Sequence, residues 1–364
     1  MSKSIIFIFP TSQLGGAERI MFNLAKYLDA INYEVVLFIL SNGRNPVLDV
    51  YSKESNMRVI YCDSCNDKNL FSYLQLFKII KINNFDFIFT SHIITNALVS
   101  LFLKTSKLNS KLISRESTVP FKRFSGYKIF VIKLLYKFFY GKQSLLIFQT
   151  DFMKKSLFEN LGYLPVKNCM VIPNCVDIDN IKKQIINSNF SYNEDVLTIV
   201  ACGRFIELKQ FDLLIKAYSD FISSYKKPTR FILVGDGPMK NELVALSEKL
   251  GIADNIIFTG NVKNPSAYFS IADIGIISST IEGFPNVILE MMIAGTKKIV
   301  STPCTPAIYN LPNILISNGC TEKDMSEALI ESANKKEDNS FLYKKYIQEF
   351  RSINSFWNKV IENI

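Results

Sequence analysis

The stretch Ile281–Glu290, IEGFPNVILE, places two carboxylates, Glu282 and Glu290, on either side of a Gly-Phe-Pro-Asn turn. Paired acids near one loop often hydrolyse a glycosidic bond, so their separation decides between chemistries. Because Pro285 suits the first turn of a helix, we expect a helix over Asn286–Ala294 and Glu282 in the loop before it. Eight helical intervals would set the carboxylates about 12 Å apart. Glycosidases use roughly 5 to 9.5 Å, so the pair is too far apart to share one bond.

Two acceptors at this separation suit the two ends of an extended polyhydroxy ligand, with the free amides of the helix start facing an anion between them. A nucleotide sugar has that shape: hydroxyls, diphosphate, hydroxyls. The string GRFIELKQFDLL adds two cations, Arg204 and Lys209, which straddle a short loop between a predicted strand and a helix. Two cations beside helix-start amides make a diphosphate clamp, although surface salt bridges are the alternative.

Other candidates follow predicted strands in the first half of the chain. Gly15 and Gly16 would let backbone approach a ligand at a helix start, or serve only the turn. His92 is the sole histidine; its place at a strand end favours a binding edge over an ordinary structural role. Arg115 and Glu116 end another strand, where an ion pair holding a loop is the alternative.

Several familiar motifs are absent or isolated. Residues 235–238, GDGP, lack the dinucleotide fingerprint GxGxxG, and no Walker GxxxxGK[ST] occurs. Asp177 and Asp179 spell a DxD in a predicted interdomain join, and Cys62 and Cys65 form a lone CxxC. With one histidine and no second cysteine pair to complete a site, we predict no metal and no other cofactor.

The elements that must position these residues alternate along the whole chain. Short β-branched or aromatic runs alternate with helical stretches in both halves, which indicates an α/β fold of two doubly wound Rossmann-like domains with parallel sheets. We expect domains over residues 1–175 and 176–345, joined at residues 172–179, and a C-terminal helix, residues 346–364, that packs back towards the first domain. Ligands of such sheets bind beyond the carboxyl ends of the strands, which predicts a site in a cleft between the domains.

Bulk properties agree with an intracellular globular protein. The chain has 364 residues, 48% apolar and 21% charged, enough for two cores. Seven scattered cysteines argue for a reducing compartment. The apolar start ends at Pro10 and resembles a buried strand rather than a signal peptide, and no run of 18 apolar residues occurs. We therefore expect a cytoplasmic protein.

Taken in order, the strings GGAE, IPNCVD, GRFIELKQFDLLIKA, VGDGP, FTG and EGFPNVILE resemble the family-four retaining glycosyltransferases of the GT-B fold, the glycosyl transferases of group 1. The match covers most of the chain, and Glu-x7-Glu is that family's signature. One departure is Cys175, where the family commonly has glycine. The resemblance implies transfer of a sugar from a nucleotide-sugar donor, UDP-hexose or UDP-N-acetylhexosamine, by same-face attack with retention. Residues 1–175 would face the acceptor and residues 176–345 the donor.

The resemblance also implies roles for particular residues. Arg204 and Lys209 would bind the donor diphosphate, Glu290 the ribose hydroxyls, and Glu282 the transferred sugar, with His92 beside that sugar. Stabilisation of the departing diphosphate by the two cations and a helix start is the electrostatic effect that is usually largest in catalysis. The remaining implied donor contacts are backbone groups or glycines, and they lie at Gly15, Gly16, Val262, Gly283, Phe284 and Asn286.

The excess of positive charge in the first half of the chain bears on the kind of acceptor. Residues 1–180 hold 22 Lys and Arg against 13 Asp and Glu, whereas residues 181–364 hold 20 of each. Within the first half, residues 121–142 have six basic residues and no acids. As one helix they would be amphipathic, with Lys133 and Lys137 opposite an apolar face. That face would comprise Tyr127, Val131, Leu134, Leu135 and Phe138.

A basic amphipathic helix suits an anionic membrane surface, and a helix packed on the core with solvated lysines is the alternative. With Lys122 and Arg123 it predicts peripheral binding to the inner face of the cytoplasmic membrane. The acceptor would then be a lipid-linked glycan or oligosaccharide, as in bacterial surface polysaccharide synthesis.

Three rival functions are weaker. A nucleotide-sugar epimerase on a related fold would need acid and base groups that one histidine scarcely supplies. A nucleic-acid binder would explain the positive charge, yet no recognition motif is visible, so no nucleic-acid partner is expected. A non-catalytic nucleotide-sugar-binding scaffold would have no use for both glutamates and both cations.

Overall fold

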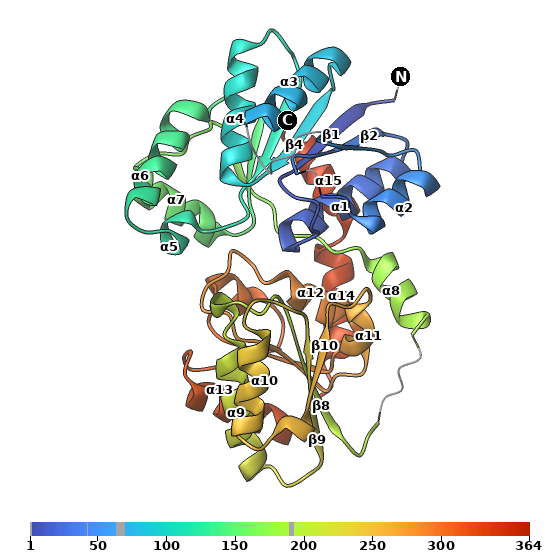
Figure 1. Ribbon diagram of the computed structural model, residues 1–364, viewed down its shortest axis with the longest axis vertical. Coiled ribbons are helices and arrows are strands. Elements are labelled where there is room, and N and C mark those ends of the chain that lie inside the picture. The colour runs from blue at the N-terminus through green and yellow to red at the C-terminus, as the bar shows by residue number, and fades with distance from the viewer. Residues whose placement is uncertain (1, 42, 63–69, 189–192) are drawn as a thin grey trace. The chain divides into compact units, whose positions relative to one another are not determined.

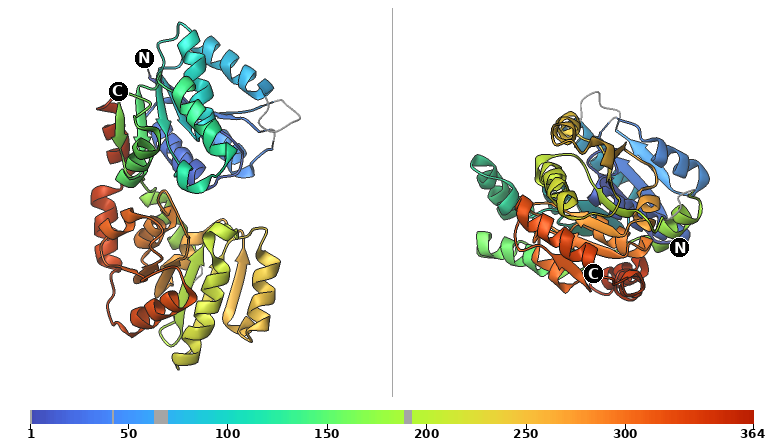
Figure 2. Two further views of the ribbon diagram at one scale, coloured as in Figure 1. Left: turned by 90° about the vertical axis from the view of Figure 1, so that its left-hand side faces the viewer. Right: turned by 90° about the horizontal axis from the view of Figure 1, so that it is seen from below.

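The structure is a computed structural model that describes residues 2–41, 43–62, 70–188 and 193–364. The chain forms two compact units: unit 1, Met1–Cys175 with Ile353–Ile364, and unit 2, Val176–Ser352. Each unit has one parallel sheet with helices on both faces (Figures 1 and 2), and the predicted α/β fold class of two Rossmann-like units is confirmed.

Among its described residues, unit 1 has a seven-stranded sheet in the order β3-β2-β1-β4-β5-β6-β7. The strands are β1 Ser4–Phe9, β2 Glu34–Ile39, β3 Arg58–Tyr61, β4 Phe87–Ser91, β5 Lys111–Arg115, β6 Leu145–Phe148 and β7 Cys169–Val171. Successive strands step outwards on both sides of the β1–β4 pair, in which Phe7 lies beside Phe89. A doubly wound sheet binds ligands at such a switch point, so the loops after β1 and β4 are the ones to inspect.

The helices of unit 1 cover the sheet because its strands are apolar on both faces. Ile5, Phe7 and Phe9 pack in one buried cluster with α1, α2 and α15, whereas Ile6 and Ile8 pack in another with α3 and α4. The helical elements are α1 Gly16–Ala30, α2 Pro46–Glu54, α3 Leu70–Asn83, α4 Ile93–Thr105, α5 Pro120–Arg123, α6 Tyr127–Leu134, η1 Leu135–Phe139, α7 Asp151–Leu161 and α15 Ile353–Ile361.

Unit 2 has, in its described part, a six-stranded sheet in the order β10-β9-β8-β11-β12-β13. Its strands are β8 Leu197–Cys202, β9 Thr229–Val234, β10 Ile256–Gly260, β11 Ile274–Ile277, β12 Lys298–Ser301 and β13 Ile314–Ile316. Its helical elements are α8 Ile178–Ile186, η2 Glu207–Lys209, α9 Phe211–Ser224, α10 Lys240–Lys249, η3 Ala253–Asn255, α11 Pro265–Ser270, α12 Asn286–Ala294, η4 Pro306–Asn310, α13 Glu322–Asn334 and α14 Ser340–Phe350. The predicted helix start at Asn286 is the start of α12.

The two C-terminal helices, α14 and α15, pack in the cores of different units. Tyr343 and Ile347 of α14 are fully buried in the core of unit 2, so that unit extends to Ser352 rather than ending at residue 345. Trp357 of α15 belongs to the core of unit 1, where its ring meets those of Tyr33 and Phe87 edge-to-face at 5.8 and 6.0 Å. The chain passes between the units twice, and the residues of unit 2 next to these two points are neighbours. Val176 N donates to Arg351 O at 3.0 Å, and Val176 forms a parallel bridge with Ser352.

The single helix predicted over residues 121–142 is wrong. The segment is broken into α5, α6 and the π-helical turn η1. Phe124 caps the end of α5, and Gly126, with φ +58°, precedes the first residue of α6 as its N-cap. The apolar pattern runs through this break, so periodicity alone could not reveal it.

Candidate active site

The loop that carries Arg204 is held by the turn after β9. Phe205 N donates to Asp236 O at 3.0 Å, and Gly203 N donates to Val234 O at 3.0 Å. Gly235 has φ +142°, and a Cβ atom there would overlap the carbonyl of Gly203. These contacts explain the GDGP string without a phosphate: its glycines let two backbone turns pack directly against each other. Arg204 itself is exposed at the carboxyl end of β8.

Gly235 should therefore be the least replaceable glycine of this turn. We expect Gly235→Ala to destabilise unit 2 by about 3 kcal/mol, because it combines backbone strain with a backbone clash. The midpoint of thermal unfolding should fall by roughly 6–12 °C. Gly251→Ala is the matched control: its φ is +68°, yet no atom in the described chain lies within 4 Å of the new Cβ. Equal shifts in the two variants, measured by circular dichroism, would refute the packing argument.

Lys209 and Glu282 form an ion pair, Nζ to Oε1, although 73 positions separate them. Ser279 Oγ donates to the same carboxylate oxygen at 2.8 Å. The two loops are fastened by Ser278 Oγ, which donates to Lys209 O at 2.5 Å, and by Thr280 N, which donates to Leu208 O at 3.0 Å. The ends of β8 and β11 thus bring a cation and a carboxylate from the predicted set into direct contact.

The Gly-Phe-Pro-Asn turn leads from Glu282 into α12. Glu282 N donates to Cys304 O at 3.0 Å, and Gly283 is buried. The Phe284 side chain is also buried, with the Arg351 guanidinium 5.3 Å from its ring centroid. Phe284 can therefore offer a ligand only its backbone. Asn286 and Glu290 are half-buried on the first turns of α12.

Cys304 is a neighbour of this pair that sequence reasoning missed. Its thiol is buried, and burial followed by the Glu282 charge raises its pKa to about 12. A thiol in that state is neutral and weakly nucleophilic. Its position just after β12, at the carboxyl edge of the sheet, was the available signal.

Val262 follows β10 and is half-buried against the core of unit 2. It lies on the same carboxyl edge as Arg204 and Glu282, since β10, β8 and β11 all end there. The residues predicted to bind the donor in unit 2 thus follow strands of one sheet at one edge.

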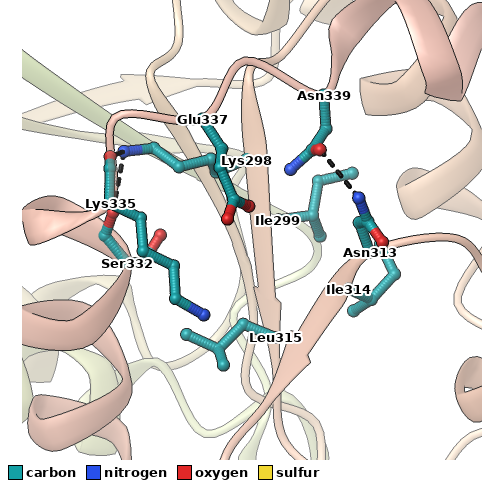
Figure 3. A pocket seen from close by; sticks show the side chains of 9 residues that line it. All are labelled: Lys298, Ile299, Asn313, Ile314, Leu315, Ser332, Lys335, Glu337 and Asn339. Carbon is teal, nitrogen blue, oxygen red and sulfur yellow. Dashed lines mark hydrogen bonds between the residues drawn. The ribbon is translucent and has the colours of Figure 1, made fainter.

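A separate hollow of about 320 Å³ lies elsewhere in unit 2 (Figure 3). It is bounded by Lys298 and Ile314, the first residues of β12 and β13, and therefore by the opposite edge of the sheet. Lys298 Nζ donates to the carbonyls of Ser332 and Lys335 at 2.7 and 2.8 Å. The hollow is remote from Arg204, Lys209 and Glu282 along the strands.

In unit 1, Gly15 and Gly16 begin α1 at the end of β1, as N-cap and first helical residue. Gly15 has an ordinary φ of −69°, so conformation does not require glycine. A Cβ atom there would lie 2.9 Å from Glu18 Oε2. The glycine makes room for a buried carboxylate that folds back over the helix start. Glu18 was quoted in the GGAE string but given no role.

His92 lies at the end of β4 with φ +83°, an unusual conformation for a side chain-bearing residue. Its Nδ1 is 2.8 Å from Ser91 O, and its Nε2 is 3.4 Å from Glu18 Oε1. The imidazole is one-third exposed, whereas the Glu18 side chain is 11% exposed. The switch point of the sheet therefore joins His92 to the glycine loop through Glu18.

Arg115 and Glu116 are buried members of a polar network. Arg115 Nη2 donates to Asn174 Oδ1 at 2.5 Å, and Tyr140 OH donates to Glu116 Oε1 at 2.8 Å. Burial lowers the pKa of Arg115 to about 10, opposed by the charges of Cys175, Glu18 and Glu116. Burial raises the pKa of Glu116.

Metal-binding groups are dispersed in the part of the chain that the structure describes, where no cluster of three or more His, Cys, Asp or Glu could hold an ion. Cys62 Sγ donates to Ser72 Oγ at 3.2 Å, and Cys65 lies outside the described residues. Asp177 caps α8 by accepting from Asn180 N at 3.1 Å.

The basic surface segment, residues 120–139, exposes aromatic rings as well as cations. Tyr127, Phe130 and Phe138 are 76%, 65% and 57% exposed, and the inward positions are Ile132 and Tyr136. Of the predicted apolar face, Tyr127, Val131 and Phe138 are exposed, whereas Leu134 and Leu135 are half-buried and Leu135 packs against the core. Several cations lie over rings, 5.4 to 6.0 Å from their centroids: Lys122 on Phe152, Arg123 on Phe124, Lys133 on Phe121 and Lys137 on Phe138. No described helix is both long and apolar enough to cross a bilayer.

Comparison with known proteins covers almost the whole chain. Residues 182–351 match the family model of glycosyl transferases group 1, and residues 14–180 match that of glycosyltransferase family 4. A curated relative from Campylobacter jejuni, N-acetylgalactosamine-N,N'-diacetylbacillosaminyl-diphospho-undecaprenol 4-alpha-N-acetylgalactosaminyltransferase, is 25% identical over 80% of this chain and 78% of its own. The amylovoran biosynthesis glycosyltransferase AmsD of Erwinia amylovora is 24% identical over 80% and 78%.

Solved structures show the same fold at low identity. HepE of Anabaena in complex with UDP-glucose superposes with a TM-score of 0.77 at 17% identity, covering 99% of this chain and 98% of its own. WaaG, a glycosyltransferase involved in lipopolysaccharide biosynthesis, gives a TM-score of 0.71 at 15% identity over 96% and 98%.

Proposed function

We propose that this chain, which belongs to the family-four, group 1 glycosyltransferases of the GT-B fold, transfers a hexose or N-acetylhexosamine from a UDP-sugar to a lipid-linked glycan with retention. A hexosyltransferase-type activity follows from the family. The donor, the acceptor and the stereochemistry are our proposal. The observation that carries it is the contact of Lys209 with Glu282 at the sheet edge that also presents Arg204 and the start of α12.

Unit 2 would bind the donor. Arg204 and Lys209 would neutralise the diphosphate, and the positive end of the α12 dipole would face the distal phosphate. Glu282, fixed by Ser279, would accept hydrogen bonds from the sugar, and Glu290 from the ribose. As the bond to the anomeric carbon breaks, negative charge grows on the diphosphate, and groups already held in place stabilise it without reorganising.

Unit 1 would supply the acceptor side and the groups beside the transferred sugar. Gly15 and Gly16 begin α1, and the Glu18 carboxylate near that start meets His92 at the adjoining strand end. The acceptor hydroxyl would attack on the face from which UDP departs, giving up its proton to a phosphate oxygen of the donor. That scheme accounts for retention without a protein nucleophile.

A lipid-linked acceptor is supported by two observations. The C. jejuni relative acts, by its name, on a diphospho-undecaprenol-linked substrate. The basic surface segment exposes rings and cations together, which suits insertion of aromatics at a lipid interface with lysines at anionic headgroups. We accordingly propose peripheral binding at the inner face of the cytoplasmic membrane during surface polysaccharide synthesis.

Calorimetric titration with UDP, GDP and ADP tests the donor assignment directly. We expect UDP to bind most tightly and Arg204→Ala to raise its dissociation constant about tenfold to a hundredfold, the worth of hydrogen bonds to a charged group. Arg230→Ala, on β9 where Nη2 binds Thr198 Oγ1 at 2.9 Å, removes an arginine of unit 2 away from the clamp and should change affinity little. Binding of no nucleotide would overturn the donor assignment. Binding without any turnover would favour the scaffold, and donor turnover without acceptor would favour the epimerase.

A further inference from the structure

The hydrogen positions on His92 follow from its neighbours. Ser91 O is a carbonyl oxygen and can only accept, so Nδ1, 2.8 Å away, must carry the hydrogen. A neutral imidazole would then present an unprotonated Nε2 to Glu18 Oε1, only 3.4 Å distant. Two electron pairs facing each other at a largely buried carboxylate repel. A second ring proton converts this repulsion into an ion pair.

The surroundings of the pair add further charges from other elements. Arg115 on β5 is fully buried and is attracted by the charges of Glu18 and Glu116. Burial favours the neutral form of Glu116. The Glu18 carboxylate on α1 thus interacts electrostatically with Arg115 and lies 3.4 Å from the His92 ring.

We propose that Glu18 is a positioning residue that holds His92 as an imidazolium, with Ser91 O fixing the other ring nitrogen. This inference rests on the proposed function, in which His92 adjoins the transferred sugar. An imidazolium has no free electron pair and cannot act as a general base. Glu18 therefore excludes the sole histidine as a general base, which agrees with the proposed transfer of the acceptor's proton to a donor phosphate oxygen.

Gly15 also helps to position the Glu18 carboxylate. Its missing side chain leaves the space that Glu18 Oε2 occupies, since a Cβ would lie 2.9 Å from that oxygen. A methyl group there would push the carboxylate away from its position. Glu18→Gln and Gly15→Ala should consequently act on His92 in the same direction by independent means.

Nitrogen NMR of the enzyme labelled with ¹⁵N-histidine tests the proposal, because the chain has a single histidine and its ring signals need no assignment. In the wild type we expect the imidazolium form at neutral pH. Loss of a facing carboxylate favours the uncharged ring, so Glu18→Gln should lower the titration midpoint of His92 by about one pH unit or more. Gly15→Ala should lower it too, and Glu18→Asp should largely restore it.

Glu34→Gln is the matched control, because Glu34 is an exposed carboxylate of unit 1 that pairs with Arg58 at 3.0 Å. It should leave the midpoint unchanged. A neutral wild-type ring with hydrogen on Nε2, or equal midpoints in wild type and Glu18→Gln, would overturn the proposal. These signals are recorded without donor, so they are independent of whether transfer occurs.

Kinetics give the second readout. A positive ring beside the sugar would stabilise the charge that grows on the departing diphosphate, so deprotonation of His92 should lower kcat/KM at alkaline pH. In Glu18→Gln this fall should move to lower pH by the same interval as the NMR midpoint, with the folded fraction checked by circular dichroism. A purely structural role would lower kcat/KM equally at every pH, and that result would contradict the proposal.

Discussion

Replacing Lys209 by methionine should lower kcat/KM for sugar transfer by about a thousandfold. The side chain keeps its length, so its contacts with the loop remain while its charge is lost. Removing one preorganised group that faces developing negative charge typically costs two to three orders of magnitude. The assay is initial-rate transfer from the UDP-sugar that binds best.

Lys209 also holds Glu282, so the loss has two possible origins that a double-mutant cycle separates. If Lys209 touches the diphosphate itself, Lys209→Met should weaken UDP binding equally in wild type and in Glu282→Gln. If Lys209 only orients Glu282, its replacement should have no effect once Glu282 is changed. Lys226→Met, at an exposed lysine of unit 2, controls for loss of a positive charge and should retain activity.

Reversing four charges on the basic surface segment should abolish binding to anionic vesicles, with at least a hundredfold fall in the partition coefficient. The residues are Lys122, Arg123, Lys133 and Lys137, each replaced by glutamate. A Lys or Arg near an anionic surface contributes about 1 kcal/mol, so losing four such contacts is a large effect before repulsion is counted. Flotation with phosphatidylglycerol-containing vesicles measures it.

The matched control reverses four exposed lysines of unit 2, which changes the net charge by the same amount. They are Lys226, Lys227, Lys249 and Lys336. Binding should survive in this variant, and transfer to a water-soluble acceptor should survive in both. Equal loss of flotation in the two variants would mean that net charge, not the segment, attracts the membrane. Flotation of neither variant nor wild type would end the membrane proposal.

Local sequence pattern predicted the fold because the buried strands are recognisable as short, continuous apolar runs. Runs such as SIIFIF are apolar at every position, which fits strands buried on both faces, and β1 indeed packs on helices on both sides. The start of α12 was predictable for an equally local reason, since Pro285 limits where the helix can begin.

The contacts within the candidate sites were beyond such reasoning because they join distant positions. Glu282 and Lys209 are 73 residues apart, and Glu18 meets His92 only because β1 and β4 are neighbours in the sheet. A string match marked Glu18 within GGAE without revealing what its carboxylate faces. The sequence pattern does not reveal the order of strands in a sheet, and that order determines which of these distant side chains meet.

The burial of Arg115 and the break in the basic surface segment were not predictable from local pattern. A charged pair at a strand end usually faces water, but Asn174, arriving from the far end of unit 1, covers Arg115. In the segment, Gly126 at φ +58° lies between two helices, and Ile132 and Tyr136 are the buried positions of the second helical stretch. Single-residue conformations of this kind leave no periodic trace.

Unit 2 is one continuous segment inserted between two parts of unit 1. Its first and last residues, Val176 and Ser352, are neighbours because they form a β-bridge. A short linker across those ends would close the excised segment into a circle with little loop-closure entropy. Permuted chains with new termini in exposed turns of unit 2 should also be tolerated. Unit 2 can thus be removed or exchanged as one continuous segment, with unit 1 restored by rejoining residues 175 and 353.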